Sequence, residues 1–343
     1  TGKPNYPRGR LYEGYRVWGF QKEIYQGVQV FRVPIIPRLS NNLFLFINYL
    51  SFVVSASIFA PFLFRSKKFD VIFVYAPSPI FQALPAIILG RILRCPVVLW
   101  VQDLWPESLK ATGTIKNRSI LKFIGHAVGA LYSRCDLILV QSIAFIESVS
   151  KLTSNRNILY HPNTVDDQFY MGSSNYFLEA SDIPSLFTIA FAGNIGRAQN
   201  VEIIVEAAEL LKDNSNIRFV LYGDGSRLEW IKNEILKRGL KNVEYLGWRP
   251  VEAMPSILSG VIALLVTLAD DEIFRYTVPS KIQAYLAVGR PIIASLDGEG
   301  ARIINAANAG ITSPAGDAKG LAQAILRMYQ LSPSDRSILG ENG

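Results

Sequence analysis

The apolar positions of this chain fall into short runs separated by helix-length segments, and this alternation occurs in two blocks. In the first half, β-branched runs occupy residues 71–77, 96–103 and 136–142. After a polar stretch over residues 162–185, further runs occupy residues 187–194, 217–225, 242–248, 260–268 and 291–295. Such alternation predicts parallel sheets covered by helices. We therefore expect an α/β chain of two Rossmann-like domains, over residues 1–165 and 166–343.

One apolar segment is too long for a strand. From Leu39 to Phe64 the chain carries no charged residue, which is enough for a membrane span of ~20 residues. Polar residues such as Asn48 and Ser51 interrupt it, and Pro61 lies near its end. These interruptions, followed by cations at 65, 67 and 68, favour a helix lying on a membrane surface over a spanning one. A buried domain helix remains an equal alternative, because periodicity alone does not separate the three.

The positive charge of the chain is concentrated at its amino end. The formal net charge is +7, and residues 1–68 hold ten Lys and Arg against Glu13 and Glu23, so that the remaining residues together contribute −1. This favours an anionic surface or acidic ligand near the amino end. We expect no nucleic acid, because no helix-turn-helix, zinc-finger or aromatic RNA-binding signature accompanies the charge. With two Cys and two His, neither a disulfide framework nor a zinc site is expected.

Three loops of the second half combine glycines with the ends of predicted strands. In open parallel sheets, ligands bind at the carboxyl ends of the strands, and glycine lets backbone N–H groups approach a phosphate closely. A single glycine turn is more often only a turn, but three in succession indicate a site. Their residues are Gly193 and Gly196, Gly223 and Gly225, and Gly247 followed by Trp248 and Arg249.

The stretch YTVPSKIQAYLAVGRPIIA, residues 276–294, predicts a short helix between a start signal and a stop signal. Ser280 is expected at the N-cap, and Gly289 followed by Pro291 ends the helix. Lys281 then falls in the first turn, where the helix dipole disfavours a cation. An anionic ligand held at this helix end would explain the position.

Taken in order, these motifs are similar to those of a known enzyme family. WVQDLWPES, HPNTVD, AGNIGRAQN, LYGDG, EYLGW and PSKIQAYLAVGRPIIA resemble the family 4 glycosyltransferases of GT-B fold, over nearly the whole chain. Among them the chain looks most like the L-fucosamine-type transferases of bacterial surface polysaccharide assembly. The resemblance implies two Rossmann-like domains across a cleft, with the nucleotide-sugar held by the second and the acceptor by the first. It also implies transfer with retention and no required metal or other cofactor.

Carried over residue by residue, the resemblance shows departures in the donor site. Family members commonly have Arg and Lys where this chain has Asn194 and Gln199, and a Glu pair where it has Arg275 and Gln283. Lys281, with Arg275 or Arg197, is expected to replace the lost cations on the diphosphate, and Gln283 to hydrogen-bond a ribose hydroxyl. The predicted donor-binding residues are Gly193, Asn194, Gly196, Arg197, Gln199, Gly223, Gly225, Gly247, Trp248, Arg275, Ser280, Lys281 and Gln283.

The first half offers candidates for the acceptor. Asp103 follows a buried strand, where a carboxylate could orient or deprotonate the acceptor hydroxyl, or else cap the next turn. Lys3, Arg8 and Arg10 lie in a loop rich in Gly and Pro and are expected over the acceptor's phosphate, unless this end is unordered.

The sequence therefore predicts a hexosyltransferase-type enzyme that takes a UDP-sugar as co-substrate. Its expected acceptor is a polyprenyl-diphosphate-linked saccharide, and its expected place is the anionic inner face of the cell membrane, reached from the cytoplasm. The alternatives are a sugar-nucleotide 2-epimerase of the same fold and a non-catalytic GT-B scaffold subunit. The resemblance also suggests that the family's first strand, glycine-rich loop and first helix, and its last helix, are missing here. A chain without them is expected to bind the donor but to transfer poorly.

Overall fold

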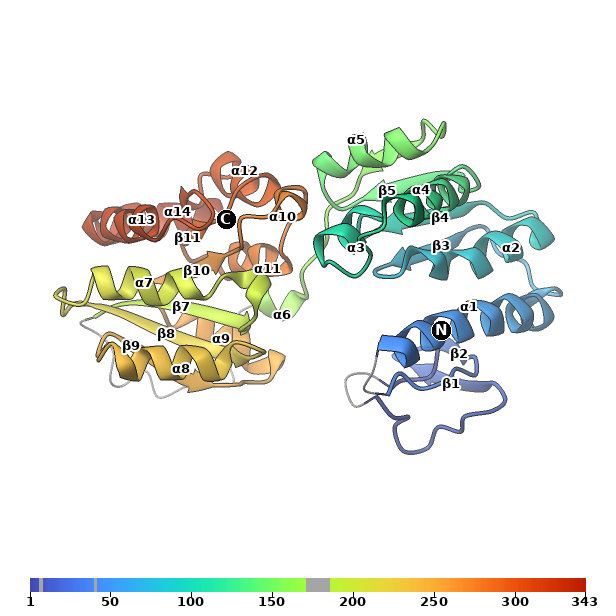
Figure 1. Ribbon diagram of the computed structural model, residues 1–343, viewed down its shortest axis with the longest axis horizontal. Coiled ribbons are helices and arrows are strands. Elements are labelled where there is room, and N and C mark those ends of the chain that lie inside the picture. Colours follow the sequence, from blue (N-terminus) through green and yellow to red (C-terminus); the bar gives the residue numbers. More distant parts are fainter. Residues whose placement is uncertain (6–8, 40–41, 171–185) are drawn as a thin grey trace. The chain divides into compact units, whose positions relative to one another are not determined.

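The computed structural model describes residues 1–5, 9–39, 42–170 and 186–343 (Figure 1). The chain forms two compact units, Thr1–His161 and Pro162–Gly343. The polar stretch of the sequence suggests a boundary slightly later, after Val165. Each unit is an α/β layer structure with its own parallel sheet.

The first unit is built on a four-stranded parallel sheet whose strands pair in chain order. Its strands are β3 (Ile72–Ala76), β4 (Val97–Val101), β5 (Leu137–Val140) and β6 (Ile158–Tyr160). Its helices are α1 (Asn42–Phe64), η1 (Ile80–Ala83), α2 (Leu84–Leu93), α3 (Glu107–Ala111), α4 (Arg118–Tyr132) and α5 (Ile143–Leu152). A two-stranded antiparallel hairpin, β1 (Gln21–Tyr25) and β2 (Val28–Arg32), precedes them.

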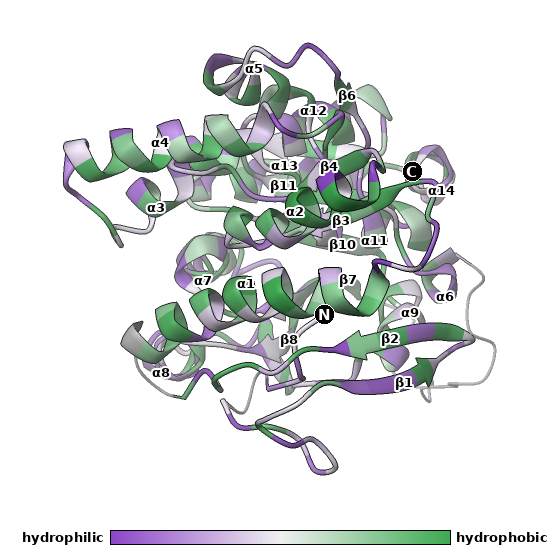
Figure 2. Cartoon of the chain, turned by 90° about the vertical axis from the view of Figure 1, so that its right-hand side faces the viewer, coloured by the Kyte–Doolittle hydropathy of each residue, from purple (hydrophilic) through white to green (hydrophobic). Residues whose placement is uncertain are grey.

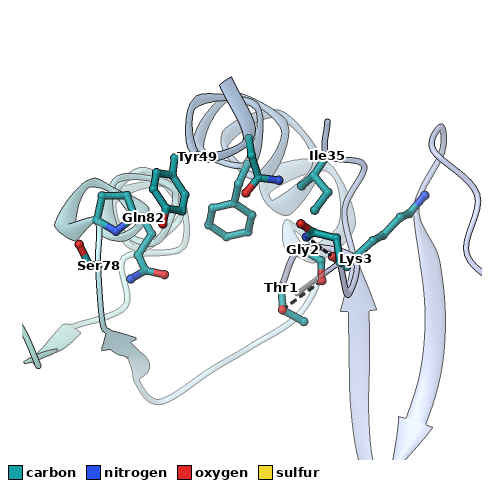
Figure 3. Close-up of a pocket in the computed structure, with 11 residues that line it drawn as sticks. Thr1, Gly2, Lys3, Ile35, Tyr49, Ser78 and Gln82 are labelled. Atoms are coloured by element: carbon teal, nitrogen blue, oxygen red, sulfur yellow. Dashed lines mark hydrogen bonds between the residues drawn. The ribbon is translucent and has the colours of Figure 1, made fainter. Parts of the chain in front are cut away.

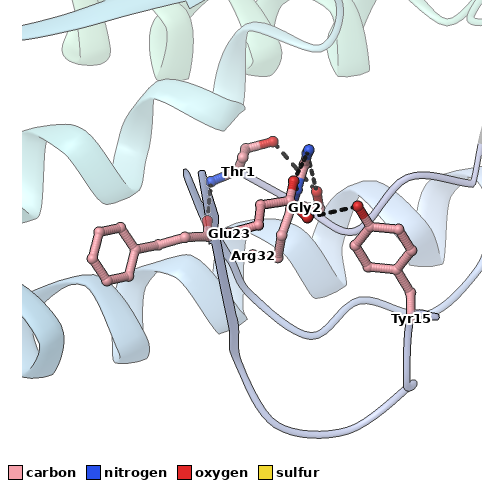
Figure 4. Close-up of polar contacts among 6 residues, drawn as sticks. Thr1, Gly2, Tyr15, Glu23 and Arg32 are labelled. Atoms are coloured by element: carbon pink, nitrogen blue, oxygen red, sulfur yellow. Dashed lines mark hydrogen bonds and ion pairs between the residues drawn. The ribbon is translucent and has the colours of Figure 1, made fainter. Parts of the chain in front are cut away.

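A polar cluster ties the hairpin to the first residues of the chain. The Glu23 carboxylate accepts from the Arg32 guanidinium, with Nε–Oε1 2.8 Å, and from the Tyr15 hydroxyl at 2.7 Å (Figure 4). Arg32 also donates to the carbonyl of Gly2 at 3.4 Å. These bonds lower the pKa of the Glu23 carboxyl, because they favour its charged form.

Helix α4 shows how local sequence determines an element of the first unit. Asn117 caps it, with Oδ1 accepting from the N–H groups of Ser119 (2.9 Å) and Ile120 (3.2 Å). Gly129 lies where α4 meets the end of α5, since a Cβ there would come within 2.1 Å of the carbonyl oxygen of Leu152. The close approach of the two helices therefore requires glycine at this position.

The second unit has a six-stranded parallel sheet in the order β12-β11-β10-β7-β8-β9. The chain starts in the middle, runs outward on one side and then crosses to the other, so β7 and β10 flank the switch point where ligands bind in doubly wound sheets. The strands are β7 (Phe187–Asn194), β8 (Ile217–Asp224), β9 (Val243–Gly247), β10 (Ala263–Thr267), β11 (Ile292–Ser295) and β12 (Gly310–Ser313).

Helices cover both faces of this sheet, and the described core divides into two clusters, one against each face. They are α6 (Asp167–Tyr170), η3 (Arg197–Gln199), α7 (Glu202–Leu210), α8 (Leu228–Lys237), η4 (Val251–Ala253), α9 (Met254–Ser259) and α10 (Glu272–Tyr276). The chain then adds α11 (Ser280–Val288), α12 (Glu299–Ala306), α13 (Ala318–Gln330) and α14 (Pro333–Asn342). Residues 187–192 of β7 and the whole of β10 are buried on both faces, which explains why they read as continuous apolar runs.

Helix α1 corresponds to the long apolar segment of the sequence. It is coloured as hydrophobic along much of its length (Figure 2). Its polar interruptions anchor the preceding chain: Asn48 donates to the Ile36 carbonyl at 2.6 Å, and Ser51 accepts from the Ile36 N–H at 3.0 Å. Residues 44–64 are long and apolar enough to cross a membrane by length and composition, and 11% of that stretch is buried.

Candidate functional site

A large cavity lies at the carboxyl end of the second unit's sheet. Its volume is about 1030 Å³, and its wall comes from the ends of β7 and β8, the segment after β9, α9, the start of α11 and the chain around α6. This is the edge at which parallel α/β sheets bind ligands. Three successive strand ends and a helix start therefore converge on one space, as the glycine turns of the sequence suggest.

Two glycines line the cavity where β7 and β8 end. Gly193 has φ +133°, and a Cβ there would lie 3.3 Å from the Lys281 ammonium. Gly223 has φ +134°, and its Cβ would come within 1.8 Å of the carbonyl oxygen of Gly193. Larger side chains would strain the backbone and fill the space between the two strand ends. These two of the predicted donor-binding glycines thus line the cavity.

Lys281 is the central cation of this site. Its side chain lines the cavity, yet its ammonium is shielded from solvent and has no hydrogen-bond partner among the described residues. The nitrogen lies 3.9 Å from the centroid of the Phe191 ring, which gives partial compensation through the face of the ring. Burial lowers the pKa of Lys281 to about 7. A buried cation with no counter-ion is a ready site for an anion.

The start of α11 adds main-chain donors beside Lys281. The N-cap is Pro279, without a side-chain cap, and Ser280 is the first helical residue, so the prediction of Ser280 as the N-cap is wrong. The reason is that Pro279 already provides the extended conformation that precedes the helix. Within the first turn, Ile282 N–H donates to the Pro279 carbonyl at 2.9 Å, while the N–H groups of Ser280 and Lys281 have no intrahelical acceptor, and such a helix end favours anions.

The loop after β7 contains an amide pair where the resemblance leads one to expect cations. Asn194 Nδ2 donates to Gln199 Oε1 at 3.2 Å, and both side chains line the cavity. Arg197 is exposed in η3 and is not among the lining residues. The two neutral side chains therefore satisfy each other, and the cation of this part of the wall comes from Lys281 on α11.

Two other residues expected to contact the donor point elsewhere. Arg275 is exposed and pairs with Asp270 at 2.8 Å, outside the cavity wall. Gln283 lies on the flank of α11, where its amide nitrogen fits as a donor to the carbonyls of Pro279 (2.9 Å) and Ser280 (3.1 Å). This arrangement does not present Gln283 to a ribose in the cavity. Gly196, Gly225 and Gly247 likewise shape the turns without lining it.

Trp248, a predicted donor-binding residue, lines the cavity just after the end of β9 and is 64% exposed. Several other lining residues are absent from the predicted set. One is Arg249, which follows Trp248 in the same motif and is the second cation among the described lining residues. Tyr285 was missed because it reads as a core residue, although its hydroxyl accepts from the Ala192 N–H at 3.0 Å and fixes α11 against β7. The remaining missed polar residues are Thr164, Asp166, Asp224 and Glu252.

In the first unit, Asp103 lies just beyond the carboxyl end of β4. Its Oδ2 accepts from Ser108 Oγ at 3.1 Å and from the Trp105 indole N–H at 3.2 Å. Burial raises the pKa of this carboxyl, and its hydrogen bonds to Ser108, Ser78 and Trp105 oppose that shift. Asp103 thus stabilises the turn into α3 through these hydrogen bonds, and its carboxylate lies half-buried at the end of the strand.

The cations expected on an acceptor phosphate are arranged differently. Lys3 is 1% exposed, and its ammonium donates to main-chain carbonyls of residues 16–19, including Gly19 at 2.8 Å. It therefore stabilises the loop before β1, so the structure gives no support to Lys3 as a phosphate ligand. Arg10 is exposed. Arg8 lies outside the described residues.

Comparison with known proteins supports a sugar-transfer site. Residues 187–331 match the family described as Glycosyl transferases group 1, which covers most of the second unit. Two curated relatives are each 27% identical over 305 residues, 84% of this chain. They are WbjE of Pseudomonas aeruginosa, named a glycosyltransferase, and WcaI of Escherichia coli, named a glycosyl transferase of colanic acid biosynthesis, and the match covers 76% and 72% of them.

Solved structures with the same fold extend over both units. Anabaena HepE, in complex with UDP, is 15% identical with a TM-score of 0.66, over 86% of this chain and 77% of its own. Sucrose-phosphate synthase from Thermosynechococcus elongatus is 16% identical with a TM-score of 0.70, over 96% of this chain and 80% of its own. At such low identity these likenesses speak for the fold.

Proposed function

We propose that this glycosyltransferase of GT-B fold moves a sugar from a UDP-sugar to a lipid-linked saccharide, and that Lys281 holds the donor's diphosphate. The observation that carries the proposal is the buried, unpartnered ammonium of Lys281 in the wall of the large cavity. A diphosphate supplies the counter-ion that the described residues around it lack. The glycosyltransferase relatives and the UDP complex of HepE support the same ligand class.

The chemistry explains why a cation is needed there. As the bond between the anomeric carbon and the diphosphate oxygen breaks, the sugar becomes oxocarbenium-like and negative charge grows on the departing diphosphate. Donors fixed beside that charge before the reaction stabilise it without reorganising. The Lys281 ammonium and the main-chain N–H groups of Ser280 and Lys281 at the start of α11 are such donors. The resemblance implies retention at the anomeric carbon, and we adopt retention as part of the proposal.

The remaining donor contacts are assigned from the cavity wall. We assign stacking on the uracil to Trp248, since an exposed aromatic side chain in the wall suits a base. Gly193 and Gly223 let the diphosphate approach the main chain. In place of Gln283, we assign ribose recognition to the carboxylates of the wall, Asp224 and Glu252, whose oxygens accept from hydroxyls.

Acceptor activation is assigned to Asp103. Its raised pKa makes the carboxylate a stronger base than an exposed aspartate, and its position beyond a strand end suits contact with a substrate hydroxyl. The proposed acceptor is a polyprenyl-diphosphate-linked saccharide of O-antigen or capsule assembly, and the proposed donor sugar is an N-acetylated deoxyamino hexose. The name of WcaI, which refers to colanic acid biosynthesis, supports a surface polysaccharide pathway.

A lipid-linked acceptor places the enzyme at a membrane, and α1 has the surface for such contact. Five large apolar residues at four-residue intervals, each half or more exposed, form a stripe along this helix: Phe46, Leu50, Val54, Ile58 and Phe62. The exposed cations Arg65, Lys67 and Lys68 follow directly. Apolar contact beside clustered cations suits the anionic inner face of the cell membrane, where the protein is proposed to bind peripherally.

The diphosphate assignment is tested by replacing the cation alone. Lys281→Met should weaken UDP binding about tenfold or more, because a charge-assisted contact to phosphate is lost. Lys319→Met, an exposed lysine on α13 of the same unit, is the matched control and should leave the affinity unchanged. Titration calorimetry with UDP measures both, and equal affinities for the two variants contradict the assignment.

The reaction class is tested with a panel of nucleotide-sugars. UDP release that depends on added acceptor is expected, and interconversion of the donor without acceptor would instead indicate a 2-epimerase. Absence of nucleotide binding would indicate a scaffold subunit.

A further inference from the structure

A second, smaller cavity lies entirely within the first unit. Its volume is about 250 Å³, and its wall is formed by the first residues of the chain, Ile35, one side of α1 and the loop after β3 (Figure 3). Tyr49 and Phe52 come from α1, while Ser78 and Gln82 come from the other side. The volume is below the ~300–1,000 Å³ of sites for drug-sized ligands. The space therefore suits one small ring rather than an extended chain.

The cation at this wall, Lys3, already has hydrogen-bond partners. The Lys3 side chain runs away from Tyr49 and Gln82 (Figure 3), and its ammonium donates to the carbonyls of the loop before β1. Burial lowers the pKa of Lys3, which further weakens its charge. Since this ammonium is not directed at a ligand, the wall is a poor match for phosphate.

The neutral polar groups of the wall, in contrast, have bonding capacity left. Gln82 Nε2 is shielded from solvent and has no hydrogen-bond partner among the described residues. A buried amide without a partner costs free energy, which a ligand acceptor would recover. Ser78 Oγ accepts from the Trp105 indole N–H at 3.1 Å, and its proton is shared with the Asp103 carboxylate, which leaves one oxygen lone pair to accept from a ligand hydroxyl. The aromatic rings of Tyr49 and Phe52 complete an apolar wall beside these two polar groups.

The same hydrogen bonds connect the cavity to Asp103. The Trp105 indole N–H that reaches Ser78 also donates to Asp103 Oδ2 at 3.2 Å. Ser78 is itself a hydrogen-bond partner of the Asp103 carboxyl. A ring held by Ser78 and Gln82 would thus lie next to the carboxylate assigned to the acceptor hydroxyl.

We propose that this cavity binds one neutral sugar ring of the acceptor, with hydroxyls on Gln82 and Ser78 and the ring against Tyr49 and Phe52. The acceptor's phosphates then lie outside it. This inference rests on the proposed transfer reaction, and it replaces the expectation that Lys3 meets an acceptor phosphate. It assigns the recognition of the acceptor to hydrogen bonds rather than to charge.

The experiment uses simple glycosides and the whole protein. Methyl glycosides of glucose, N-acetylglucosamine and fucose, and separately inorganic phosphate, are tested for binding by saturation-transfer or phosphorus NMR, with UDP present in excess to occupy the larger cavity. At least one glycoside should bind, and phosphate should neither bind nor displace it. Gln82→Met, which keeps the side-chain length, should weaken glycoside binding about five- to tenfold.

Matched variants separate a binding defect from a folding defect. Gln29→Met, at an exposed glutamine of β2, should bind glycosides as the wild type does, and Ser78→Ala is a second, smaller change in the wall. Glycoside binding that is absent, or equal in wild type, Gln82→Met and Ser78→Ala, overturns the proposal, as does displacement by phosphate. UDP affinity, measured separately, distinguishes the two proposals. Normal UDP binding without glycoside binding would contradict the acceptor site in the smaller cavity but not the proposed donor site.

Discussion

The buried charge of Lys281 destabilises the folded protein, and in the proposed function the same charge binds the ligand. Its ammonium is removed from water without a counter-ion among the residues that the structure describes, which costs free energy in the empty protein. An anionic ligand at the same place removes that cost, because the charge then has a partner. Stability lost at one residue is thus a source of affinity, as at many functional sites.

The stability of the unliganded protein should therefore depend on pH through Lys281. Its pKa is about 7 in the folded chain, against 10.5 for an ordinary lysine, so between these values the unfolded chain holds a proton that the folded chain lacks. The loss of folding free energy caused by burying the charged ammonium is therefore full below pH 7, and it decreases as the pH rises towards 10.5. Lys281→Met should stabilise the protein by a few kcal/mol at pH 6, on the order of several degrees in Tm, and by less at pH 9.

Thermal unfolding at the two pH values, without nucleotide, measures this effect. Lys319→Met should show no comparable gain at either pH. A gain from Lys281→Met that is the same at pH 6 and pH 9 would mean that the ammonium is not charged and buried as described.

At the scale of one element, α1 has two functions on two sides. On one side, Asn48 and Ser51 hydrogen-bond to the main chain of Ile36. The exposed apolar stripe from Phe46 to Phe62 takes no part in these hydrogen bonds. Apolar surface of this extent, with cations at one end, is the physical basis of the proposed membrane contact.

Changes to the stripe and to its cations should weaken vesicle binding independently. Ile58→Asp should reduce sedimentation with phosphatidylcholine–phosphatidylglycerol vesicles, because a charge cannot enter the apolar layer. Lys68→Gln should weaken binding about fivefold at low salt, since each cation near an anionic surface contributes ~1 kcal/mol.

Leu236→Asp, on the exposed side of α8 in the second unit, is the matched control for Ile58→Asp. Binding that is independent of the anionic lipid, or unchanged by Ile58→Asp, would show that α1 is not the membrane-contacting element.

At the scale of the whole molecule, the two units have separate sheets, and the cavity proposed to bind the donor is built from one of them. Every described residue that lines it lies in Pro162–Gly343. Ligand binding stabilises the part that binds by RT ln(1 + [L]/Kd), about 2.7 kcal/mol at a hundredfold excess over Kd.

UDP should consequently raise the unfolding temperature of the second unit selectively. Scanning calorimetry with a hundredfold excess should move the transition of Pro162–Gly343 upward by roughly 5 to 10 °C and leave that of Thr1–His161 in place. A single transition that moves as a whole would show that the units unfold together, and no movement would argue against the donor cavity.

Much of the architecture follows from the linear pattern of residues. Strand segments buried on both faces must be apolar, so β7, β10 and β11 appear as runs in the sequence, and the helices between the strands follow from the spacing. The glycine turns and Lys281 were also visible, because a turn at a strand end and a cation at a helix start are local features. These features indicate the edge of the second sheet at which the large cavity lies.

What only the tertiary structure decides is the direction and the environment of each side chain. Gln283 and Lys281 are two residues apart on α11, yet Gln283 turns back to the helix start while Lys281 lines the cavity. Lys3 reads as an accessible cation, but carbonyls of residues 16–19 surround it. Gln82 and Ser78 carry no motif, and they meet Tyr49 and Phe52 through packing between α1 and the loop after β3. Local sequence determines which elements form; burial, partners and cavities depend on contacts between residues distant in the chain, which no local pattern contains.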